Sequence, residues 1–365
     1  MATSASLTSA GPRIAVVGAG AVGGYIGAHL AHAGHDVTLI DPWPGHVEAM
    51  RAHGLHITGM SAGETINPKV RAIHLTEAQH FARERPIDIA ILSVKSYDTT
   101  WAATFIKQYL SEDGVIVSAQ NSINETAIAA VVGWDKTIGC MVGNNYAVDL
   151  YEPGCIRRTM PKGGAYAALQ VGEVHGRITP RLKQLASILS AVDKSDTTTN
   201  LWGVRWSKLV VNGMRNGVSA ATGMGGNERD GHDIIRRIVM QLAGEAVNVG
   251  RALGLDLETI AGLAPDLYSA AIDGNTDAFA KVEGSMISGT KGTARSALQR
   301  PSMAQDMAKG RRTEIQHMNG LIASRGKSVG CAAPTHEALT AVVQRVERGE
   351  IPAKPDNLFH LLPNR

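Results

Sequence analysis

The sequence predicts an α/β domain with a parallel sheet, followed by an all-helical domain. In the first half, short β-branched and apolar runs alternate with helical patterns, which is typical of parallel βαβ units. A polar stretch at 193–200, DKSDTTTN, separates this half from one with helical patterns. A chain of 365 residues is also too long for one compact core. We therefore expect a disordered tail over 1–11, an α/β domain over 12–196 and a helical domain over 197–365.

Two runs of the first half have the character of central strands. Residues 87–94 and 114–119 are apolar nearly throughout, as expected of parallel strands covered on both faces. The first expected helix stops at Gly34, a residue type that commonly ends helices. Further strands are expected over 13–17 and 36–40, helices over 21–33 and 180–189, and a β layer over the shorter runs of 137–192.

The second half is expected to consist of helices joined by irregular segments. The stretch 283–300 is polar and contains glycines, so we expect a mobile loop there. The tail from Gly349 onward contains three prolines and is expected to be extended. Helices are expected over 202–218, 231–253, 257–264, 303–324 and 334–347.

The composition excludes several classes of function. The formal net charge of +3, from 36 basic and 33 acidic side chains, is too small to indicate a nucleic-acid or membrane-surface partner. The three cysteines are far apart and form no CxxC pair, so we expect reduced thiols in a cytoplasmic protein. We expect no metal site, because the sequence has no HExxH motif or Cys/His cluster. No apolar window is long enough to predict a membrane span.

A glycine motif lies directly between the first expected strand and helix. Gly18 is suited to a tight turn, Gly20 to close approach of a pyrophosphate, and Gly23 to close packing of helix on strand. The helix N-terminus adds free N–H groups and a positive dipole. This context predicts a Rossmann dinucleotide site, and the alternative is a tight turn without a ligand. The expected cofactor-binding residues of the motif are Gly18, Ala19, Gly20, Ala21, Val22 and Gly23.

An acidic residue, Asp41, ends the second expected strand about 20 residues after the motif. A carboxylate at this place accepts hydrogen bonds from the ribose hydroxyls of NAD and repels the 2′-phosphate of NADP. The next residue, Pro42, offers no positive charge. We therefore expect NAD as the cofactor, with NADP as the alternative. In that alternative Asp41 only ends its strand, and His46 or Arg51 holds the phosphate.

Polar residues recur at places that can form one site. Lys208, Asn212 and Asn216 are spaced four apart, so they lie on one face of a helix and can look into one cleft. Lys95 and Asn121 follow the ends of two central strands, where such sheets bind their ligands. The alternatives are a solvated helix face for the first group and solvated loop residues for the second.

Five separated motifs resemble the ketopantoate (2-dehydropantoate) reductase family. The resemblance covers nearly the whole chain and implies a Rossmann domain, a helical domain like the C-terminal domain of 6-phosphogluconate dehydrogenase, and a homodimer. It also implies hydride transfer between a nicotinamide and a small 2-oxo acid, a carboxylate. The motifs are GAGAVGGYIGAHLAHAGHDVTLID from Gly18, SVKSYDT at 93–99, QNSINE at 120–125, WSKLVVNGMRN at 206–216 and PSMAQDMAKGRRTEI at 301–315.

The resemblance also implies roles for single residues. The lysine matching Lys208 is the general acid that protonates the substrate carbonyl oxygen, and a lysine suits this role because its ammonium stabilises a developing alkoxide. Asn212 and Asn216 match asparagines that position the substrate and the lysine. Lys95 and Asn121 match residues on the nicotinamide and substrate side. Asn121 is therefore expected to be both catalytic and cofactor-binding, and Lys95 to be cofactor-binding.

Two further matches lie in the last motif. Ser302 matches a serine that binds the substrate carboxylate, and Glu314 matches a catalytic glutamate that holds a substrate hydroxyl or the catalytic lysine. Ser302 has a structural alternative, because Ser302 and Gln305 fit a helix capping box. Asp306 lies one turn into the same helix and could be structural or could orient a neighbouring residue. We expect the structural role, since a helix dipole favours an acidic residue there.

Some positions depart from the family pattern. Ser122 stands where the family commonly has glycine, Arg215 where a residue is usually apolar, and Gly217 where proline is frequent. The stretch 283–300 also looks longer than the family needs. Together with Asp41, these departures indicate a relative whose substrate or direction differs from ketopantoate reduction.

Three functions therefore remain open. The first is an NAD-dependent reductase of a small 2-oxo acid, with ketopantoate as the family's default. The second is an NAD-dependent dehydrogenase that oxidises a different hydroxy acid or an alcohol. The third, a dinucleotide sensor without turnover, is disfavoured because Lys208 and the two asparagines are present.

Overall fold

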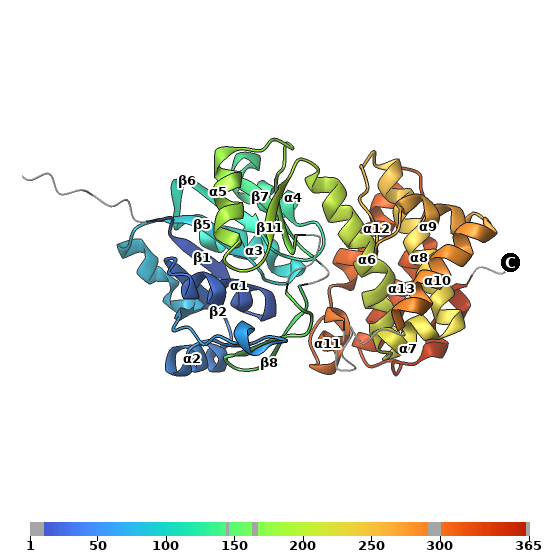
Figure 1. Cartoon of the computed structure of the whole chain (residues 1–365), viewed down its shortest axis with the longest axis horizontal. Helices are drawn as coiled ribbons and strands as arrows, with labels where there is room; N and C mark the ends of the chain where they lie inside the picture. Colours follow the sequence, from blue (N-terminus) through green and yellow to red (C-terminus); the bar gives the residue numbers. More distant parts are fainter. Residues whose placement is uncertain (1–10, 144–145, 163–166, 291–300, 363–365) are drawn as a thin grey trace, which may run out of the picture. The chain divides into compact units, whose positions relative to one another are not determined.

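The computed structural model describes residues 11–143, 146–162, 167–290 and 301–362, and the chain divides into two units (Figure 1). The α/β unit contains the residues up to Thr198, apart from two short segments. These segments, Lys95–Tyr97 and Asn121–Ile123, group with the helical unit, which otherwise begins at Thr199. The chain thus divides two residues later than the sequence places the boundary.

The α/β unit is built on a sheet with eight strands among the described residues. The strand order is β11-β10-β7-β6-β5-β1-β2-β4, and neighbours are parallel except β7 and β10. The central strand β1 therefore has β2 on one side and β5 on the other, with Ile14 opposite Val37 and Ile89. The strands are β1 (Ile14–Val17), β2 (Val37–Asp41), β4 (Arg71–His74), β5 (Ile87–Leu92), β6 (Leu110–Ser118), β7 (Thr137–Val142), β10 (Leu169–Glu173) and β11 (Ser195–Thr198).

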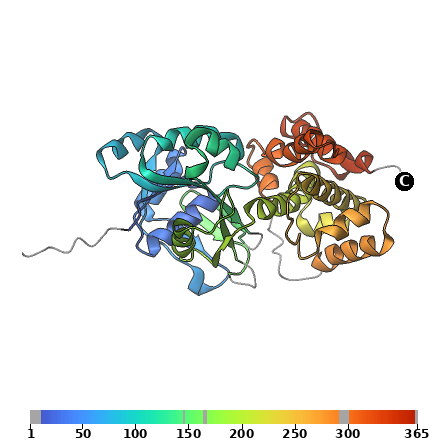
Figure 2. The same ribbon diagram turned by 90° about the horizontal axis from the view of Figure 1, so that it is seen from above.

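Apolar side chains cover both faces of this sheet, because successive residues of a strand point to opposite sides. Ile14 and Val16 belong to one hydrophobic cluster, and Ala15 and Val17 to another. Helices pack on both faces (Figure 2). The first cluster includes residues of α1 (Ala21–His32), α2 (Pro44–His53) and α5 (Pro180–Leu189), and the second includes residues of η2 (Leu75–Arg83), α3 (Thr99–Lys107) and α4 (Glu125–Val132).

A small second sheet completes the α/β unit, with β9 (Cys155–Arg158) between β3 (His56–Thr58) and β8 (Val148–Glu152). The predicted β layer after residue 137 is thus divided, because β7, β10 and β11 extend the main sheet while β8 and β9 form the small one. The remaining short 3-10 helices are η1 (Ala62–Glu64), η3 (Ser96–Asp98) and η4 (Trp134–Lys136).

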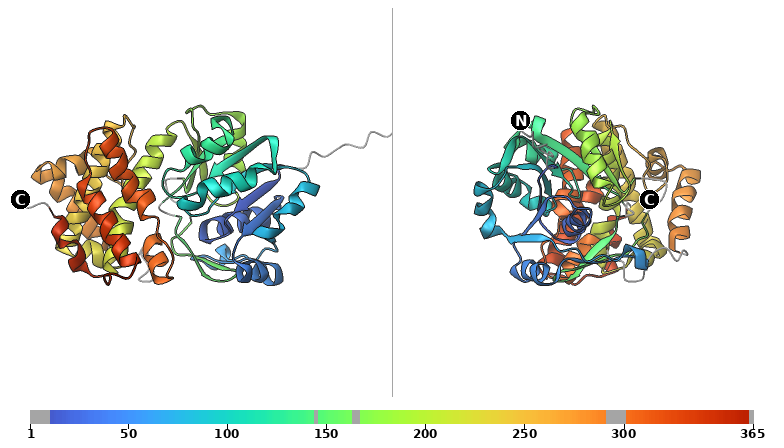
Figure 3. Two further views of the ribbon diagram at one scale, coloured as in Figure 1. Left: turned by 180° about the vertical axis from the view of Figure 1, so that it is seen from behind. Right: turned by 60° about the vertical axis from the view of Figure 1, so that its left-hand side comes forward.

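The helical unit is organised around one long helix, α6 (Leu201–Thr222) (Figure 3). Apolar residues of α6 pack against those of α8 (Asp233–Ala252). Trp206 of α6 is buried and donates a hydrogen bond from its indole nitrogen to the Ala246 carbonyl of α8 at 2.9 Å. The other helices are α7 (Gly226–Gly231), α9 (Pro265–Ile272), α10 (Thr276–Thr290), α11 (Ser302–Ala308), α12 (Ile315–Ser328), α13 (Pro334–Glu347) and η5 (Pro355–Leu361).

Two glycines let neighbouring helices approach α6 closely. A Cβ atom on Gly213 would lie 2.8 Å from the Ile322 side chain of α12, and one on Gly217 would lie 2.9 Å from the Ile315 side chain. Asn319 of α12 reinforces this contact by donating a hydrogen bond to the Gly213 carbonyl at 2.8 Å. The glycine at 217, a departure from the family pattern, therefore serves close helix packing.

Several expectations for the second half are wrong. Residues 257–264 form no helix but a turn closed by a bridge between Ile260 and Leu263, and α9 begins at Pro265. The helix expected over 303–324 is broken between α11 and α12, where Gly310 adopts a φ of 61°. Residues 283–290 belong to α10 rather than to a loop, while 291–300 lie outside the described residues, as do residues 1–10 of the expected tail.

Two polar or proline-rich stretches also form regular structure. The expected domain linker contains β11, because its extended backbone pairs in parallel with β10. The expected extended tail contains the 3-10 helix η5, since Pro355 is suited to a first helical turn. The predictions for α5 and for α13, by contrast, are confirmed to the residue.

The described part of the chain contains no helix long and apolar enough to cross a membrane. It also contains no group of three or more metal-ligating side chains placed to hold a metal ion. Cys140, Cys155 and Cys331 are free thiols.

Candidate functional site

The glycine turn lies at the centre of the main sheet, directly after β1. The chain reaches the strands on one side of β1 first and then returns to β5 on the other, so β1 and β5 flank a topological switch point. Gly18 begins the turn with a φ of 89°, in the left-handed region that favours glycine. A Cβ there would also lie 3.0 Å from the backbone of Ser93 and Val94, which follow β5.

Gly20 and Gly23 differ in a way that supports their separate predicted roles. A Cβ on Gly23 would lie 2.1 Å from the Gly18 carbonyl oxygen and 2.8 Å from Cβ of Ser93, so no larger residue fits. A Cβ on Gly20 would meet no atom within 4 Å, and no side chain caps the helix that starts there. The first amides of α1, at Ala21 and Val22, therefore border open space. This arrangement fits a dinucleotide pyrophosphate.

Asp41 is buried and bonds within the protein. One carboxylate oxygen accepts a hydrogen bond from the Ala19 amide and the other from the Trp43 amide, both at 2.9 Å. The Ala19 carbonyl in turn contacts Nε2 of His46 at 2.9 Å. Asp41 thus helps to shape the glycine turn, and each of its oxygens retains one lone pair for a ribose hydroxyl.

His46 and Arg51, the two residues that could instead bind a 2′-phosphate, already have hydrogen-bond partners within the protein. His46 is fully buried, and its Nδ1 accepts a hydrogen bond from the Gly154 amide while Nε2 contacts Ala19. Arg51 donates to the Ala72 carbonyl and pairs with Glu48 and Glu77. Neither side chain is placed to receive a 2′-phosphate.

Within the helical unit, the polar face of α6 contacts two of the other predicted segments. Nδ2 of Asn212 donates to Oδ1 of Asn121 at 3.2 Å. Nδ2 of Asn216 lies 3.5 Å from Oγ of Ser302, the first residue of α11. One helix face therefore brings together four predicted site residues that are distant in the sequence.

Lys95 binds two buried carboxylates of the helical unit. Its Nζ lies 2.6 Å from Asp306 of α11 and 3.4 Å from Glu314, which immediately precedes α12. Burial lowers the pKa of Lys95, but the charges of Glu314 and Asp306 outweigh this effect and raise it above the usual value. Lys95 therefore carries a stable positive charge.

Glu314 also fixes the residue after Lys95. One of its carboxylate oxygens accepts hydrogen bonds from the Ser96 amide at 2.9 Å and from the Ser96 hydroxyl at 2.7 Å. The same hydroxyl lies 3.3 Å from the Asn121 carbonyl oxygen. Glu314 thus holds the 95–97 segment in place. Through the Ser96 hydroxyl it also positions the backbone of Asn121, one of the predicted site residues.

Lys208 is half-buried on the polar face of α6. Burial, together with the positive charge of Arg215, lowers the pKa of its ammonium to about 7. A lysine with this pKa exchanges a proton readily near neutral pH, as a general acid or base must.

Ser122 has a strained backbone and a buried hydroxyl. Its φ is 71°, in the left-handed region that costs a non-glycine residue roughly 1–2 kcal/mol. The hydroxyl donates a hydrogen bond to the His317 carbonyl of α12. The serine therefore fastens the Asn121 segment to α12 in a conformation that glycine would adopt without strain.

The sequence analysis does not identify Ser96 as a site residue, although Ser96 belongs to the SVKSYDT motif. For Asp306, the alternative that it orients a neighbouring residue fits the structure better than a role at the helix dipole, because Asp306 is buried and bound to Lys95. The capping-box alternative for Ser302 is not supported, because Pro301 precedes the helix as its N-cap and Ser302 is the first helical residue.

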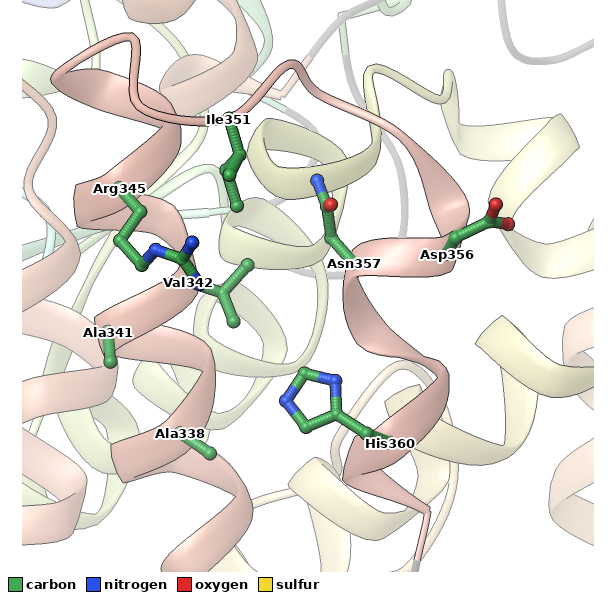
Figure 4. Close-up of a pocket in the computed structure, with 8 residues that line it drawn as sticks. All are labelled: Ala338, Ala341, Val342, Arg345, Ile351, Asp356, Asn357 and His360. Carbon is green, nitrogen blue, oxygen red and sulfur yellow. The ribbon is translucent and has the colours of Figure 1, made fainter.

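A pocket of the described chain lies elsewhere in the helical unit. It has a volume of about 460 Å³ and lies between α13 and η5, with Arg345, Asn357 and His360 among its lining residues (Figure 4). None of the predicted site residues lines it.

Both units of the chain match the models of one known protein family. Residues 14–168 match the family model for "Ketopantoate reductase PanE/ApbA", and residues 200–347 match that for its C-terminal domain. A 2-dehydropantoate 2-reductase of Lactococcus lactis is 28% identical, over 92% of this chain and 98% of that protein. A PanE/ApbA family ketopantoate reductase of Ralstonia eutropha is 28% identical with a TM-score of 0.74, covering 93% of this chain and 99% of that one.

D-mandelate dehydrogenase, solved with NADH and anilino(oxo)acetate, is also similar in structure. It is 24% identical with a TM-score of 0.74, and the similarity covers 92% of this chain and 99% of that one. At this identity the similarity establishes the fold alone.

The two glycine roles can be separated by one pair of variants. We expect Gly23→Ala to lower the melting temperature by several degrees, because its Cβ would overlap the Gly18 carbonyl. Gly20→Ala should melt near the wild-type temperature but bind dinucleotide at least about tenfold more weakly, as measured by calorimetry. Unchanged binding by Gly20→Ala would show that this glycine does not serve the cofactor.

The strain at Ser122 predicts an order of stability. Ser122→Ala loses the hydrogen bond to His317 and keeps the strained backbone, so its free energy of unfolding should fall by about 1 kcal/mol. Ser122→Gly loses the same bond but relieves the strain, so it should lie nearer to wild type. Denaturant unfolding of the three proteins tests this order, and an alanine variant as stable as the glycine variant would contradict it.

Proposed function

Because the chain belongs to the ketopantoate reductase PanE/ApbA family of NAD(P)-dependent oxidoreductases acting on CH–OH groups, we propose that it interconverts a small 2-oxo acid and its 2-hydroxy acid, with NAD as the preferred cofactor. Ketopantoate is the family's default substrate. The observation that carries this proposal is the lowered pKa of Lys208 on a helix face whose asparagines contact Asn121 and Ser302.

Each residue of this face has a proposed task. Lys208 donates a proton to the carbonyl oxygen in the reductive direction and removes it from the hydroxyl in the oxidative direction. Asn212, Asn216 and Ser302 orient the substrate, with the Ser302 hydroxyl donating to its carboxylate. When bound, the nicotinamide supplies the hydride or accepts it.

A second group of residues positions the first. Asn121 is proposed to contact substrate or cofactor while Asn212 fixes its amide. Glu314 acts mainly through its bonds to Lys95 and Ser96, so in our proposal it keeps the 95–97 segment in place. Lys95 would then offer its positive charge to the cofactor.

The preference for NAD is inferred from the end of β2. Asp41 places a negative charge there, and the two basic side chains that could bind a 2′-phosphate are committed to other partners. The pyrophosphate would be held by the turn from Gly18 to Gly23, with Gly20 permitting its approach.

The alternative is an NAD-dependent dehydrogenase that oxidises another hydroxy acid or an alcohol. Two departures from the family pattern favour a changed substrate, namely Arg215 on α6 and the bonded hydroxyl of Ser122. A panel of 2-oxo acids with NADH and NADPH, alongside hydroxy acids and alcohols with NAD⁺ and NADP⁺, distinguishes the two. A homodimer and a cytoplasmic location remain predictions from the sequence.

The pKa of Lys208 predicts opposite pH profiles for the two directions. The ammonium predominates below about pH 7, so kcat/KM for reduction should fall above that pH, while oxidation should fall below it. Lys208→Ala should lower kcat at least about a hundredfold while dinucleotide binding, measured by calorimetry, is retained. In Lys208→Arg the break near pH 7 should disappear, because a guanidinium stays protonated. Undiminished turnover by Lys208→Ala would refute the proton-transfer role.

The cofactor preference is tested at Asp41. Asp41→Asn removes the charge that repels a 2′-phosphate, so the ratio of kcat/KM for NADPH to that for NADH should rise by about tenfold or more. The melting temperature serves as a control, because the same carboxylate holds the Ala19 amide. A ratio that stays constant in a variant of normal stability would show that Asp41 does not select the cofactor.

A further inference from the structure

Trp43 exposes a large aromatic ring two residues after Asp41, at the end of β2. Its exposed fraction is 39%, although tryptophan side chains are highly buried on average. Trp134 of the same unit is also exposed, but it directly precedes β7 and so lies at the amino ends of the parallel strands. Ligands of such sheets bind at the carboxyl ends. Trp43 is therefore the better placed of the two to contact a ligand.

The Trp43 ring is held in place by contacts within the α/β unit. Its amide donates a hydrogen bond to the Asp41 carboxylate at 2.9 Å, and the following Pro44 restricts its backbone to the extended region, with a φ of −86° and a ψ of 103°. The indole stacks on the His46 ring, with the ring centroids 5.7 Å apart and 28° between the planes. An aromatic surface that is already ordered binds a flat partner at a smaller cost in conformational entropy.

The same contacts connect the indole to the glycine turn. Nε2 of His46, whose ring stacks on the indole, contacts the Ala19 carbonyl at 2.9 Å. The Ala19 amide in turn donates to the Asp41 carboxylate at 2.9 Å. Trp43 thus belongs to one hydrogen-bonded and stacked group with the residues that we propose hold the pyrophosphate and the ribose.

An exposed ring at this place is suited to a purine base. In NAD and NADP the adenine is attached to the ribose whose hydroxyls Asp41 is proposed to bind. Every base has a π-face, so stacking on an aromatic side chain strengthens binding without any hydrogen bond to the base. The exposed part of the indole contributes nothing to the hydrophobic core, whereas a base that covered it would bury apolar surface.

We propose that Trp43 is a cofactor-binding residue whose indole stacks on the adenine of the dinucleotide. The inference rests on the proposed function, because it takes the pyrophosphate to lie at the glycine turn and the adenosine ribose at Asp41. The two side chains then have different tasks. Asp41 distinguishes NAD from NADP, whereas Trp43 strengthens the binding of both, because both contain adenine.

The test measures binding of ADP-ribose, which carries the adenine and lacks the nicotinamide. We expect Trp43→Leu to bind ADP-ribose and NADH about tenfold more weakly than wild type by calorimetry. Trp43→Tyr should keep most of the affinity, because tyrosine retains an aromatic face. Trp134→Leu is the matched control, since it removes an exposed indole at the other edge of the sheet, and it should bind both ligands as wild type does.

Fluorescence gives a second measurement that does not depend on affinity. Saturating ADP-ribose should quench the tryptophan fluorescence of wild type and of Trp134→Leu, and this quenching should be lost in Trp43→Tyr. The ratio of the Kd for NADPH to that for NADH should be the same in Trp43→Leu and wild type, because Asp41 is unchanged. A changed ratio would show that the substitution acts by displacing Asp41 and would overturn the stacking role.

Melting temperatures show whether each variant is folded. If Trp43→Leu does not fold, the fluorescence of wild type and Trp43→Tyr decides. Binding of ADP-ribose by folded Trp43→Leu as tightly as by wild type, or quenching that persists in Trp43→Tyr, would overturn this inference and leave the proposed function intact. If wild type bound neither NADH nor ADP-ribose, the proposed cofactor site would fail, and this inference with it.

Discussion

The helical unit depends on one shared cation, the ammonium of Lys95. Asp306 and Glu314 bring their buried carboxylates to it from α11 and from the residue before α12. Two buried carboxylates without a cation would repel each other, and removing one partner of a buried ion pair typically costs about 3–5 kcal/mol. Lys95 is partly exposed, so water reduces this cost. The interaction fixes the 95–97 segment. Within this segment, the Ser96 hydroxyl contacts the Asn121 carbonyl, and the Asn121 side chain in turn accepts a hydrogen bond from Asn212 of α6.

The proposed function places two requirements on the polar face of α6. Its lysine must be buried deeply enough to release a proton near neutral pH, and its asparagines must remain hydrogen-bonded to keep their orientation. Gly213 and Gly217 allow α12 to pack closely beside this helix. On the same side of α6, Nδ2 of Asn216 lies 3.8 Å from the Met318 sulfur of α12.

The sequence predicts much of the fold because its signals are local. The β1 strand, the glycine turn and α1 follow from hydrophobic patterning and turn chemistry, and α5 and α13 begin with proline and match their predicted bounds. The sequence does not predict the break before α12 or the strand β11, since these depend on partners distant in the chain. The same holds for the site. Lys208 and Asn212 could be placed on one face from spacing, but the bond of Asp306 to Lys95 spans 211 positions and has no local signal.

The helical unit is not one continuous stretch of chain, because it includes Lys95–Tyr97 and Asn121–Ile123. A gene fragment that began at Thr199 would encode the helices without the loops that neutralise and bond them. It would leave two acidic groups without their counterion, and Asn212 without its amide acceptor. The two halves of this protein are therefore poor candidates for separate expression or for exchange with halves of relatives, unless both loops are grafted as well.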